Sequence, residues 1–232
     1  MTSKPGRIVA INGNMITVQF DDHVIQNEVA FAVLGDQRLK SEVIRVRGMQ
    51  ADLQVFEETN GLRVNDAVEF AGNLLSVELG PGLLTQVFDG LQNPLPRLAE
   101  ECGFFLKRGT YLKALSRETQ WEFTPLVKQG DTVRAGSWLG SVPEGIFEHK
   151  IMAPFDLAGA WTVTSIVDKG ACTVDSPVAV IASADGRTRE VAMVQEWPVK
   201  IAIDAYADRQ RPVEPLTTKC RIIDTFFPIS RG

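Results

Sequence analysis

Long apolar runs are missing from this sequence of 232 residues, and the first six residues contain no apolar segment. A membrane-spanning helix needs about 20 apolar residues and a secretory signal needs an apolar core, so neither is expected. Histidine and cysteine are scarce, because the chain has only two of the first and three of the second, all widely spread. Zinc sites need such residues in clusters. These absences predict a cytosolic protein with reduced thiols and no metal site.

An excess of positive charge is also missing. The chain has 24 Lys and Arg residues against 29 Asp and Glu residues, which gives a net charge of −5. Binding to nucleic acid through bulk charge is therefore not expected. The phosphate-binding pattern Gly-x-x-x-x-Gly-Lys-Ser/Thr does not occur, and no lysine follows Gly80-Pro81-Gly82. A triphosphate site of this kind needs a lysine on the phosphates and a hydroxyl on Mg²⁺, so this turn is not predicted to bind nucleotide.

His149 is the one histidine worth weighing as a general base. It lies between Glu148 and Lys150 in an expected strand, and no partner carboxylate or nucleophile is spaced to make a site with it. We interpret it as a solvated or hydrogen-bonded strand residue. The sequence therefore predicts no catalytic, cofactor-binding or metal-ligating residue in this chain.

Residues 7–70 contain short strands separated by polar turns. Apolar and polar residues alternate from Ile16 to Phe20, and Asn12-Gly13-Asn14 before them is typical of a hairpin turn. This pattern predicts a small closed barrel or a sandwich. A barrel that binds single-stranded nucleic acid needs exposed aromatic residues and a basic groove. We expect the aromatic residues to face the core instead, namely Phe20, Phe31, Phe56 and Phe70.

The segment Ser76–Leu95 predicts a strand, a tight turn and a short helix. Ser76–Leu79 is extended, and Gly80-Pro81-Gly82 forces the turn. An apolar face at helical spacing then predicts a helix that stops at Asn93-Pro94. The residues of that face are Leu83, Leu84, Val87, Phe88 and Leu91.

Residues 104–185 form two pseudo-repeated halves, with glycines at the turns between short strands. This pattern predicts a barrel-sandwich hybrid, the fold of biotinyl and lipoyl carriers. By analogy with that fold, a carrier presents its modified lysine about seven residues before the Ala153-Pro154 pair. That position is near Ile146, where no lysine stands, and Lys150 is too close to the pair. Three tryptophans are expected to be core or interface residues with paired indole N–H groups. They are Trp121, Trp138 and Trp161.

Several segments resemble the catalytic A subunit of V/A-type rotary ATPases. They are QVFEETNGLRVNDAVEF, SVELGPGLL with FDGLQNPL, HKIMAPF, MVQEWPVK and PLTTKCRIIDTFFPISRG. Asn65 and Phe155 stand where the family has Gly and Pro, and the stretch 201–212 departs from the family pattern, so no role is carried over to it. Cys220 is expected to be a buried small residue.

The resemblance implies a mainly β chain with four parts. Residues 1–72 would form an N-terminal β-barrel, and residues 104–185 an inserted barrel-sandwich bulge. Residues 73–103 and 186–232 would be pieces of an α/β nucleotide-binding domain that ends before the phosphate-binding loop. The F-type subunits and the non-catalytic B subunit share the barrel but lack the bulge, so the bulge favours the A subunit.

The same resemblance implies the function. The intact subunit would make or hydrolyse ATP, with ATP or ADP and Mg²⁺ bound, and couple this to H⁺ or Na⁺ transport. It would alternate with B subunits in a hexameric ring, contact the central and peripheral stalks, and lie on the cytoplasmic side, peripheral to the membrane. The chain alone would be inactive. The alternatives are a stand-alone interaction module without catalysis and a biotinyl or lipoyl carrier without its lysine.

Overall fold

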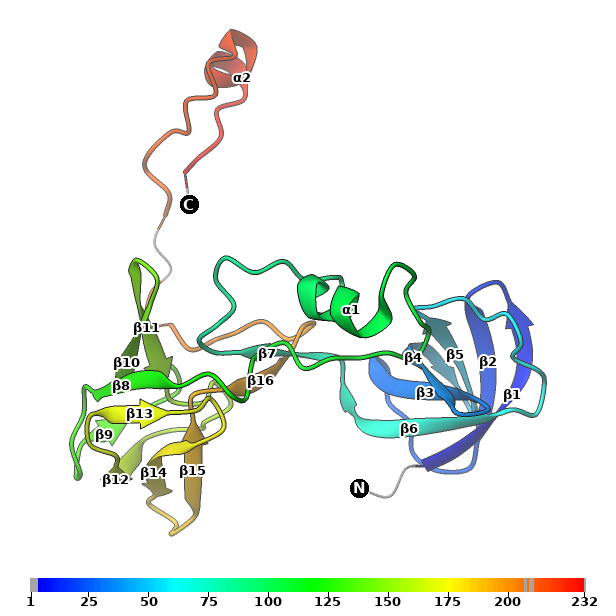
Figure 1. Ribbon diagram of the computed structural model, residues 1–232, viewed down its shortest axis with the longest axis horizontal. Helices are drawn as coiled ribbons and strands as arrows, with labels where there is room; N and C mark the ends of the chain where they lie inside the picture. The colour runs from blue at the N-terminus through cyan, green and yellow to red at the C-terminus, as the bar shows by residue number, and fades with distance from the viewer. Residues whose placement is uncertain (1–3, 207, 209–210, 232) are drawn as a thin grey trace. The chain divides into compact units, whose positions relative to one another are not determined.

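The computed structural model describes residues 4–206, 208 and 211–231. The chain divides into two compact units, Met1–Ala202 and Ile203–Gly232. The first unit contains a barrel, a sandwich of two sheets and a two-stranded ribbon (Figure 1). Each unit is described separately below.

Six antiparallel strands close the barrel in the order β1-β2-β5-β4-β3-β6 (Figure 1). Closure pairs every edge, which removes the exposed backbone donors and acceptors of an open sheet. The closed form confirms the prediction of a small barrel. The strands are β1 (Lys4–Asn12), β2 (Met15–Phe20), β3 (Glu28–Leu34), β4 (Gln37–Arg47), β5 (Gln50–Val55) and β6 (Ala67–Leu74).

The predicted alternation in β2 sets the register of the barrel. Ile16, Val18 and Phe20 are buried in the core. Val18 pairs with Ile8 on one side and with Ala51 on the other, and both of these residues are also buried. Phe20 and Phe70 meet edge to face with ring centroids 5.8 Å apart. The alternation therefore identified the face that the barrel buries.

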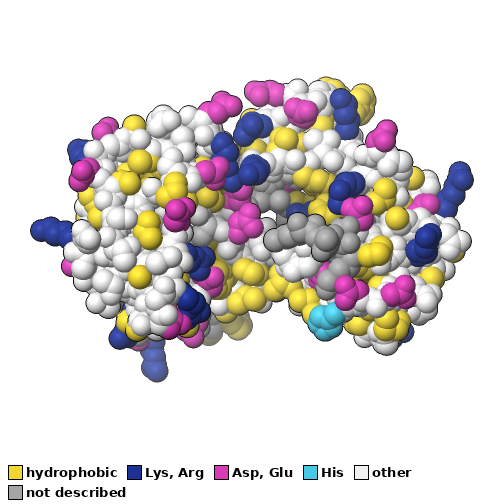
Figure 2. Space-filling view, turned by 90° about the horizontal axis from the view of Figure 1, so that it is seen from below, with side chains coloured by type: hydrophobic (Ala, Val, Ile, Leu, Met, Phe, Trp, Pro, Cys, Tyr) yellow, Lys and Arg dark blue, Asp and Glu magenta, His cyan; other side chains and the backbone are white. Residues whose placement is uncertain are grey.

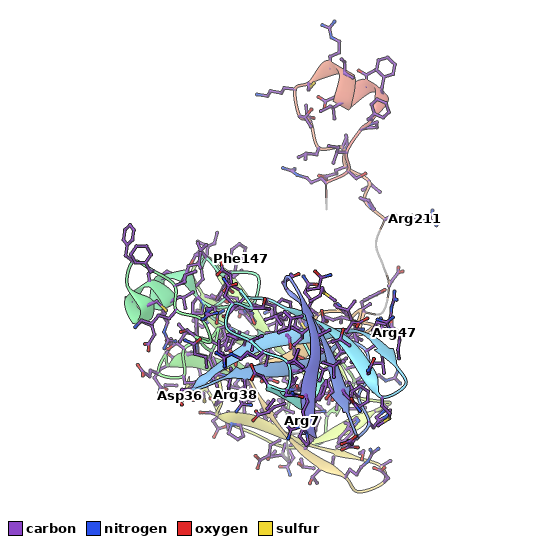
Figure 3. The ribbon with its side chains drawn as sticks, turned by 90° about the vertical axis from the view of Figure 1, so that its right-hand side faces the viewer. Arg7, Asp36, Arg38, Arg47, Phe147 and Arg211 are labelled. Carbon is purple, nitrogen blue, oxygen red and sulfur yellow. The ribbon has the colours of Figure 1, made fainter. Side chains whose placement is uncertain are left out.

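Two of the four aromatic residues expected in the core lie elsewhere. Phe31 and Phe56 are only partly buried, so the prediction is correct for Phe20 and Phe70 and wrong for these two. Ala30 and Ala32 fill the inward positions of β3, which turns Phe31 to the outer wall. The outer wall also carries exposed arginines, three of which are labelled in Figure 3, namely Arg7, Arg38 and Arg47.

The sandwich consists of two four-stranded sheets, in the orders β11-β10-β8-β13 and β15-β14-β12-β9. The Gly130 N–H donates to Val163 O at 2.8 Å and the Gly136 N–H donates to Ala153 O at 3.0 Å, so turns of the first half bind the second half. The strands are β8 (Trp121–Pro125), β9 (Thr132–Val133), β10 (Trp138–Glu144), β11 (Phe147–Met152), β12 (Trp161–Ile166), β13 (Gly170–Cys172), β14 (Pro177–Ser183) and β15 (Thr188–Ala192).

The three tryptophans of the sandwich differ in their surroundings. Trp161 is buried and its indole N–H donates to Ala158 O at 3.1 Å, as predicted. Trp138 is 57% exposed, with Lys150 over its ring, so it is not a core residue. Trp121 is partly buried, and its indole nitrogen finds no hydrogen-bond partner among the residues with assigned positions. The expected pairing of the N–H is therefore wrong for Trp121.

Strand β7 (Ser76–Leu79) pairs with β16 (Gln195–Pro198) in an antiparallel ribbon. Pro198 is the last residue of β16 and pairs with Ser76. Both strands of a two-stranded ribbon are edges, where a proline without an N–H is tolerated. The ribbon thus joins the segment before the sandwich to the segment after it, although they lie more than 100 residues apart in the sequence.

The helix expected over residues 83–91 does not form. That stretch consists of turns and irregular backbone with one isolated β-bridge, and the helix α1 (Leu95–Cys102) begins only after Pro94. Thr85 and Gln92 have φ of 63° and 64°, which an α-helix does not accept. The Asp89 carboxylate instead accepts the backbone N–H groups of Leu91 and Asn93 at 2.9 and 2.7 Å. Local side-chain bonds therefore replace the helical ones.

The second unit contains the short helix α2 (Arg221–Phe226). The Asp224 carboxylate accepts hydrogen bonds from Thr218 and from the backbone N–H of Lys219, and these bonds hold its pKa below the usual range. These contacts bind the turn before the helix to its first turn. Cys220 is exposed, so the expectation that it is buried is wrong.

None of the helices formed by the described residues is both long and apolar enough to cross a membrane. On the face shown in Figure 2, the Lys and Arg side chains are interspersed with Asp and Glu side chains. This mixture agrees with the small net charge of −5.

Candidate functional site at the Gly80-Pro81-Gly82 turn

The turn after β7 packs closely against the two segments that flank the sandwich in the sequence, one before β8 and one after β15. A Cβ atom on Gly80 would lie 3.0 Å from both Leu115 Cδ1 and Met193 O, which is closer than side chains normally approach. Gly82 has a φ of +106°, and a Cβ there would meet the Trp121 ring at 3.4 Å. Glycine is therefore required at both positions, by close packing at the first and by backbone conformation at the second.

Glu144 at the end of β10 binds the backbone of this turn. Its Oε1 accepts hydrogen bonds from the N–H groups of Gly82 and Leu84, at 2.7 and 3.1 Å. The residue is only 7% exposed, so the carboxylate has little access to water. Charge-assisted bonds of this kind are stronger than neutral ones, and they join the turn to the sandwich.

The second oxygen of the same carboxylate contacts His149. Glu144 Oε2 lies 2.6 Å from His149 Nδ1. The prediction that His149 is a hydrogen-bonded strand residue is correct, but the expectation that it has no partner carboxylate is wrong. Glu144 pairs with Phe147 across the hairpin, which puts His149 on the neighbouring diagonal position of the same face. The turn at Gly145-Ile146 is the sequence signal that could have revealed this contact.

A second ionic contact lies on β7 itself. Arg117 forms a salt bridge with Glu78, and its Nε lies 2.9 Å from Asp175 Oδ2. Burial lowers the pKa of Arg117, but the hydrogen bonds and charges of Glu78 and Asp175 outweigh it and raise the pKa. Glu78 also accepts the backbone N–H of Leu115 at 3.1 Å. The segment that precedes β8 of the sandwich is thus bound to β7, the strand that follows the barrel.

The chemistry open to this site is limited by its hydrogen bonds. Backbone N–H groups bind a phosphate when they point together at an unoccupied position. Here the N–H groups of Gly82 and Leu84 already donate to a carboxylate that belongs to the chain. Within the described part of the chain, no three His, Cys, Asp or Glu residues are grouped to hold a metal ion. The arrangement is that of a structural junction.

Comparison with known proteins identifies the family. Residues 8–72 match the model of the ATP synthase alpha/beta family β-barrel domain, and residues 112–200 match the ATP synthase alpha/beta subunit barrel-sandwich domain. Together these matches cover more than half of the sequence, and they coincide with the barrel and the sandwich of the structure. The chain belongs to the ATP synthase alpha/beta family.

Within this family, the chain is similar to V-type ATP synthase alpha chains. It is 55% identical to the V-type ATP synthase alpha chain of Treponema denticola over 232 residues, which is 100% of this chain and 39% of that protein. It is 52% identical to alpha chain 1 of Treponema pallidum, with the same shares, and 50% identical to the alpha chain of Borreliella afzelii over 98% of this chain and 40% of that protein. The chain thus spans about two fifths of the length of these relatives.

Proposed function

We propose that this chain is part of the catalytic alpha chain of a V-type ATP synthase or ATPase, which makes or hydrolyses ATP coupled to H⁺ or Na⁺ transport. The observation that carries the proposal is similarity to V-type ATP synthase alpha chains along the full 232 residues. ATP or ADP and Mg²⁺ would bind to other parts of the subunit. The 232 residues would supply contacts within the ring and with the stalks, and no chemistry.

The partition of the chain follows from the same proposal. Residues 1–72 are the barrel that contacts neighbouring subunits, and residues 104–185 are the bulge available to the peripheral stalk. Residues 73–103 and 186–232 are pieces of the nucleotide-binding domain. Pairing of β7 with β16 supports this partition, because it brings a strand of each piece together.

The partners and location are proposed on the same basis. The subunit would alternate with B subunits in a hexameric ring, contact the central stalk, and lie on the cytoplasmic side of a membrane that it meets only through the complex. No nucleic-acid partner is proposed, in keeping with the net charge of −5.

A chimeric subunit tests this function. This chain would replace the matching segment of the alpha chain of Treponema denticola, and the complex would be reconstituted with its remaining subunits. We expect a ring that assembles and hydrolyses ATP at a rate comparable to that of the parent, because the two segments are 55% identical. Size-exclusion chromatography and a phosphate-release assay give the two measurements.

The matched control is the same chimera with Gly80→Val. The new side chain would collide with Leu115 and the Met193 carbonyl, so assembly should fail. The proposal is contradicted if the chimera itself folds, as judged by cooperative melting, but does not enter the ring. That outcome would favour a stand-alone interaction module.

A further inference from the structure

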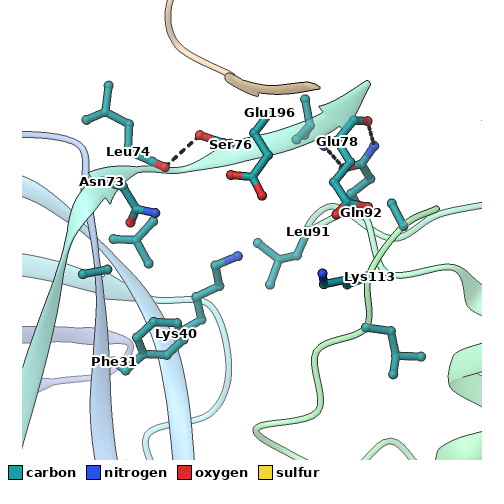
Figure 4. Close-up of a pocket in the computed structure, with 15 residues that line it drawn as sticks. Phe31, Lys40, Asn73, Leu74, Ser76, Glu78, Leu91, Gln92, Lys113 and Glu196 are labelled. Atoms are coloured by element: carbon teal, nitrogen blue, oxygen red, sulfur yellow. Dashed lines mark hydrogen bonds between the residues drawn. The ribbon is translucent and has the colours of Figure 1, made fainter. Parts of the chain in front are cut away.

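A cavity of about 290 Å³ lies between the outer wall of the barrel and the β7–β16 ribbon. Figure 4 shows the side chain of Lys40, from β4, reaching into it with its amine toward the centre. Apolar side chains form much of the wall. They include Phe31, Leu74, Val77, Leu91 and Leu112.

The backbone N–H of Lys40 has a hydrogen-bond partner, whereas its amine has none among the described residues and contacts only the face of an aromatic ring. The Lys40 N–H donates to the Tyr111 hydroxyl at 2.6 Å, and the Lys40 Nζ lies 5.8 Å from the centroid of the Tyr111 ring. Among the residues that the structure describes, no oxygen forms a hydrogen bond or an ion pair with this Nζ. Surface lysines keep their amines in water, whereas this amine lies in a cavity whose wall is part apolar and part polar.

Besides Lys40 and the Tyr111 already described, four ionisable groups face the cavity or influence the amine. Glu78 is already bound to Arg117, and Lys113 is exposed at the rim. Burial lowers the pKa of Lys40, while the charges of Asp89 and Glu196 act in the opposite direction without cancelling the effect of burial. The free amine, which is the nucleophilic form, is therefore more abundant at neutral pH than in an exposed lysine.

We propose that Lys40 is a site of covalent acylation by small activated acyl donors of the acyl phosphate class. The lone pair of the amine attacks the acyl carbon and a C–N bond forms. The C–O bond to phosphate breaks, and phosphate leaves with the electron pair. The amine loses one proton to the solvent, and the product is a neutral amide. A cavity of about 290 Å³ with both apolar and polar walls has room for a short acyl group.

Acetyl phosphate is the probe for the test. The full 232-residue chain would be treated for short times between pH 6.5 and 9, digested, and analysed by mass spectrometry. Each pKa unit of lowering gives about tenfold more free amine at pH 7, and part of this gain is lost to weaker nucleophilicity. We expect acetylation of Lys40 about threefold faster or more than that of the exposed Lys128 and Lys169 at pH 7.

Two controls test whether the reactivity of Lys40 comes from its surroundings in the folded chain and not from the neighbouring residues in the sequence. Glu196→Gln removes a charge that favours the ammonium form, so it should speed acetylation of Lys40 and leave Lys128 unchanged. In 8 M urea, where the cavity is lost, all three lysines should react alike; a urea concentration of about this value unfolds most small domains. The proposal is overturned if Lys40 in the folded chain reacts no faster than the exposed lysines, or if its advantage persists in urea.

Discussion

Val18→Asp is expected to destabilise the barrel strongly. Val18 is fully buried between Ile8 and Ala51, and the surrounding core offers it no ion partner among the described residues. A carboxylate there must be buried unpaired or drawn out by opening the strands, at a cost of about 3–5 kcal/mol. Since small domains are stable by only about 5–15 kcal/mol, much of the stability is lost. Chemical denaturation followed by far-ultraviolet circular dichroism measures the change.

Gln19→Asp is the matched control for this variant. Gln19 is the next residue of β2 and is exposed, so the same carboxylate should change the free energy of unfolding by only about 0.5 kcal/mol. If Val18→Asp unfolds at the same denaturant concentration as Gln19→Asp, the register of β2 described above is wrong.

Glu144→Ala is expected to weaken the junction more than any other single change of a charged residue at the turn. It leaves the N–H groups of Gly82 and Leu84 without their acceptor and removes the partner of His149. Unsatisfied buried donors cost about 1–3 kcal/mol each, and partial hydration should reduce the total to about 2–4 kcal/mol. Trp121 lies against Gly82, so its fluorescence should report the loss during denaturation.

Two further variants isolate the role of Glu144. Glu144→Gln keeps an acceptor for the turn but presents an amide toward His149, so we expect an intermediate loss of stability. Glu148→Ala removes an exposed carboxylate from the same hairpin, where ionic bonds contribute little, and should be nearly neutral. Equal effects of Glu144→Ala and Glu148→Ala would contradict the role assigned to Glu144.

The buried face of a strand could be predicted from the sequence where one face is buried and the other is solvated. Ile16, Val18 and Phe20 followed this rule, because period-two alternation admits only one buried face. The expectation that Phe31 faces the core was wrong, because the inward residues of its strand are two small alanines. The Phe31 ring instead packs outside the barrel against Tyr111, with 6.3 Å between the ring centroids. The residue type alone did not determine whether the side chain points into or out of the barrel.

Helical spacing was misleading after the Gly80-Pro81-Gly82 turn. The apolar residues there have the spacing of a helix face, but Leu84 is 42% and Val87 is 60% exposed. The Asp89 carboxylate and two residues with positive φ fix turns instead. The contact of Glu144 with the turn was also missed, because it joins residues about 60 positions apart and no local pattern encodes it. Tertiary hydrogen bonds decided both cases.

Calorimetric titration of the 232-residue chain with Mg-ATP tests most directly the central claim that the Gly80-Pro81-Gly82 turn is a structural junction closed by Glu144. Because both backbone donors at this turn bind that carboxylate and the sequence has no phosphate-binding pattern, no heat of binding is expected up to millimolar ATP. Saturable binding with a Kd in the micromolar range would contradict the claim.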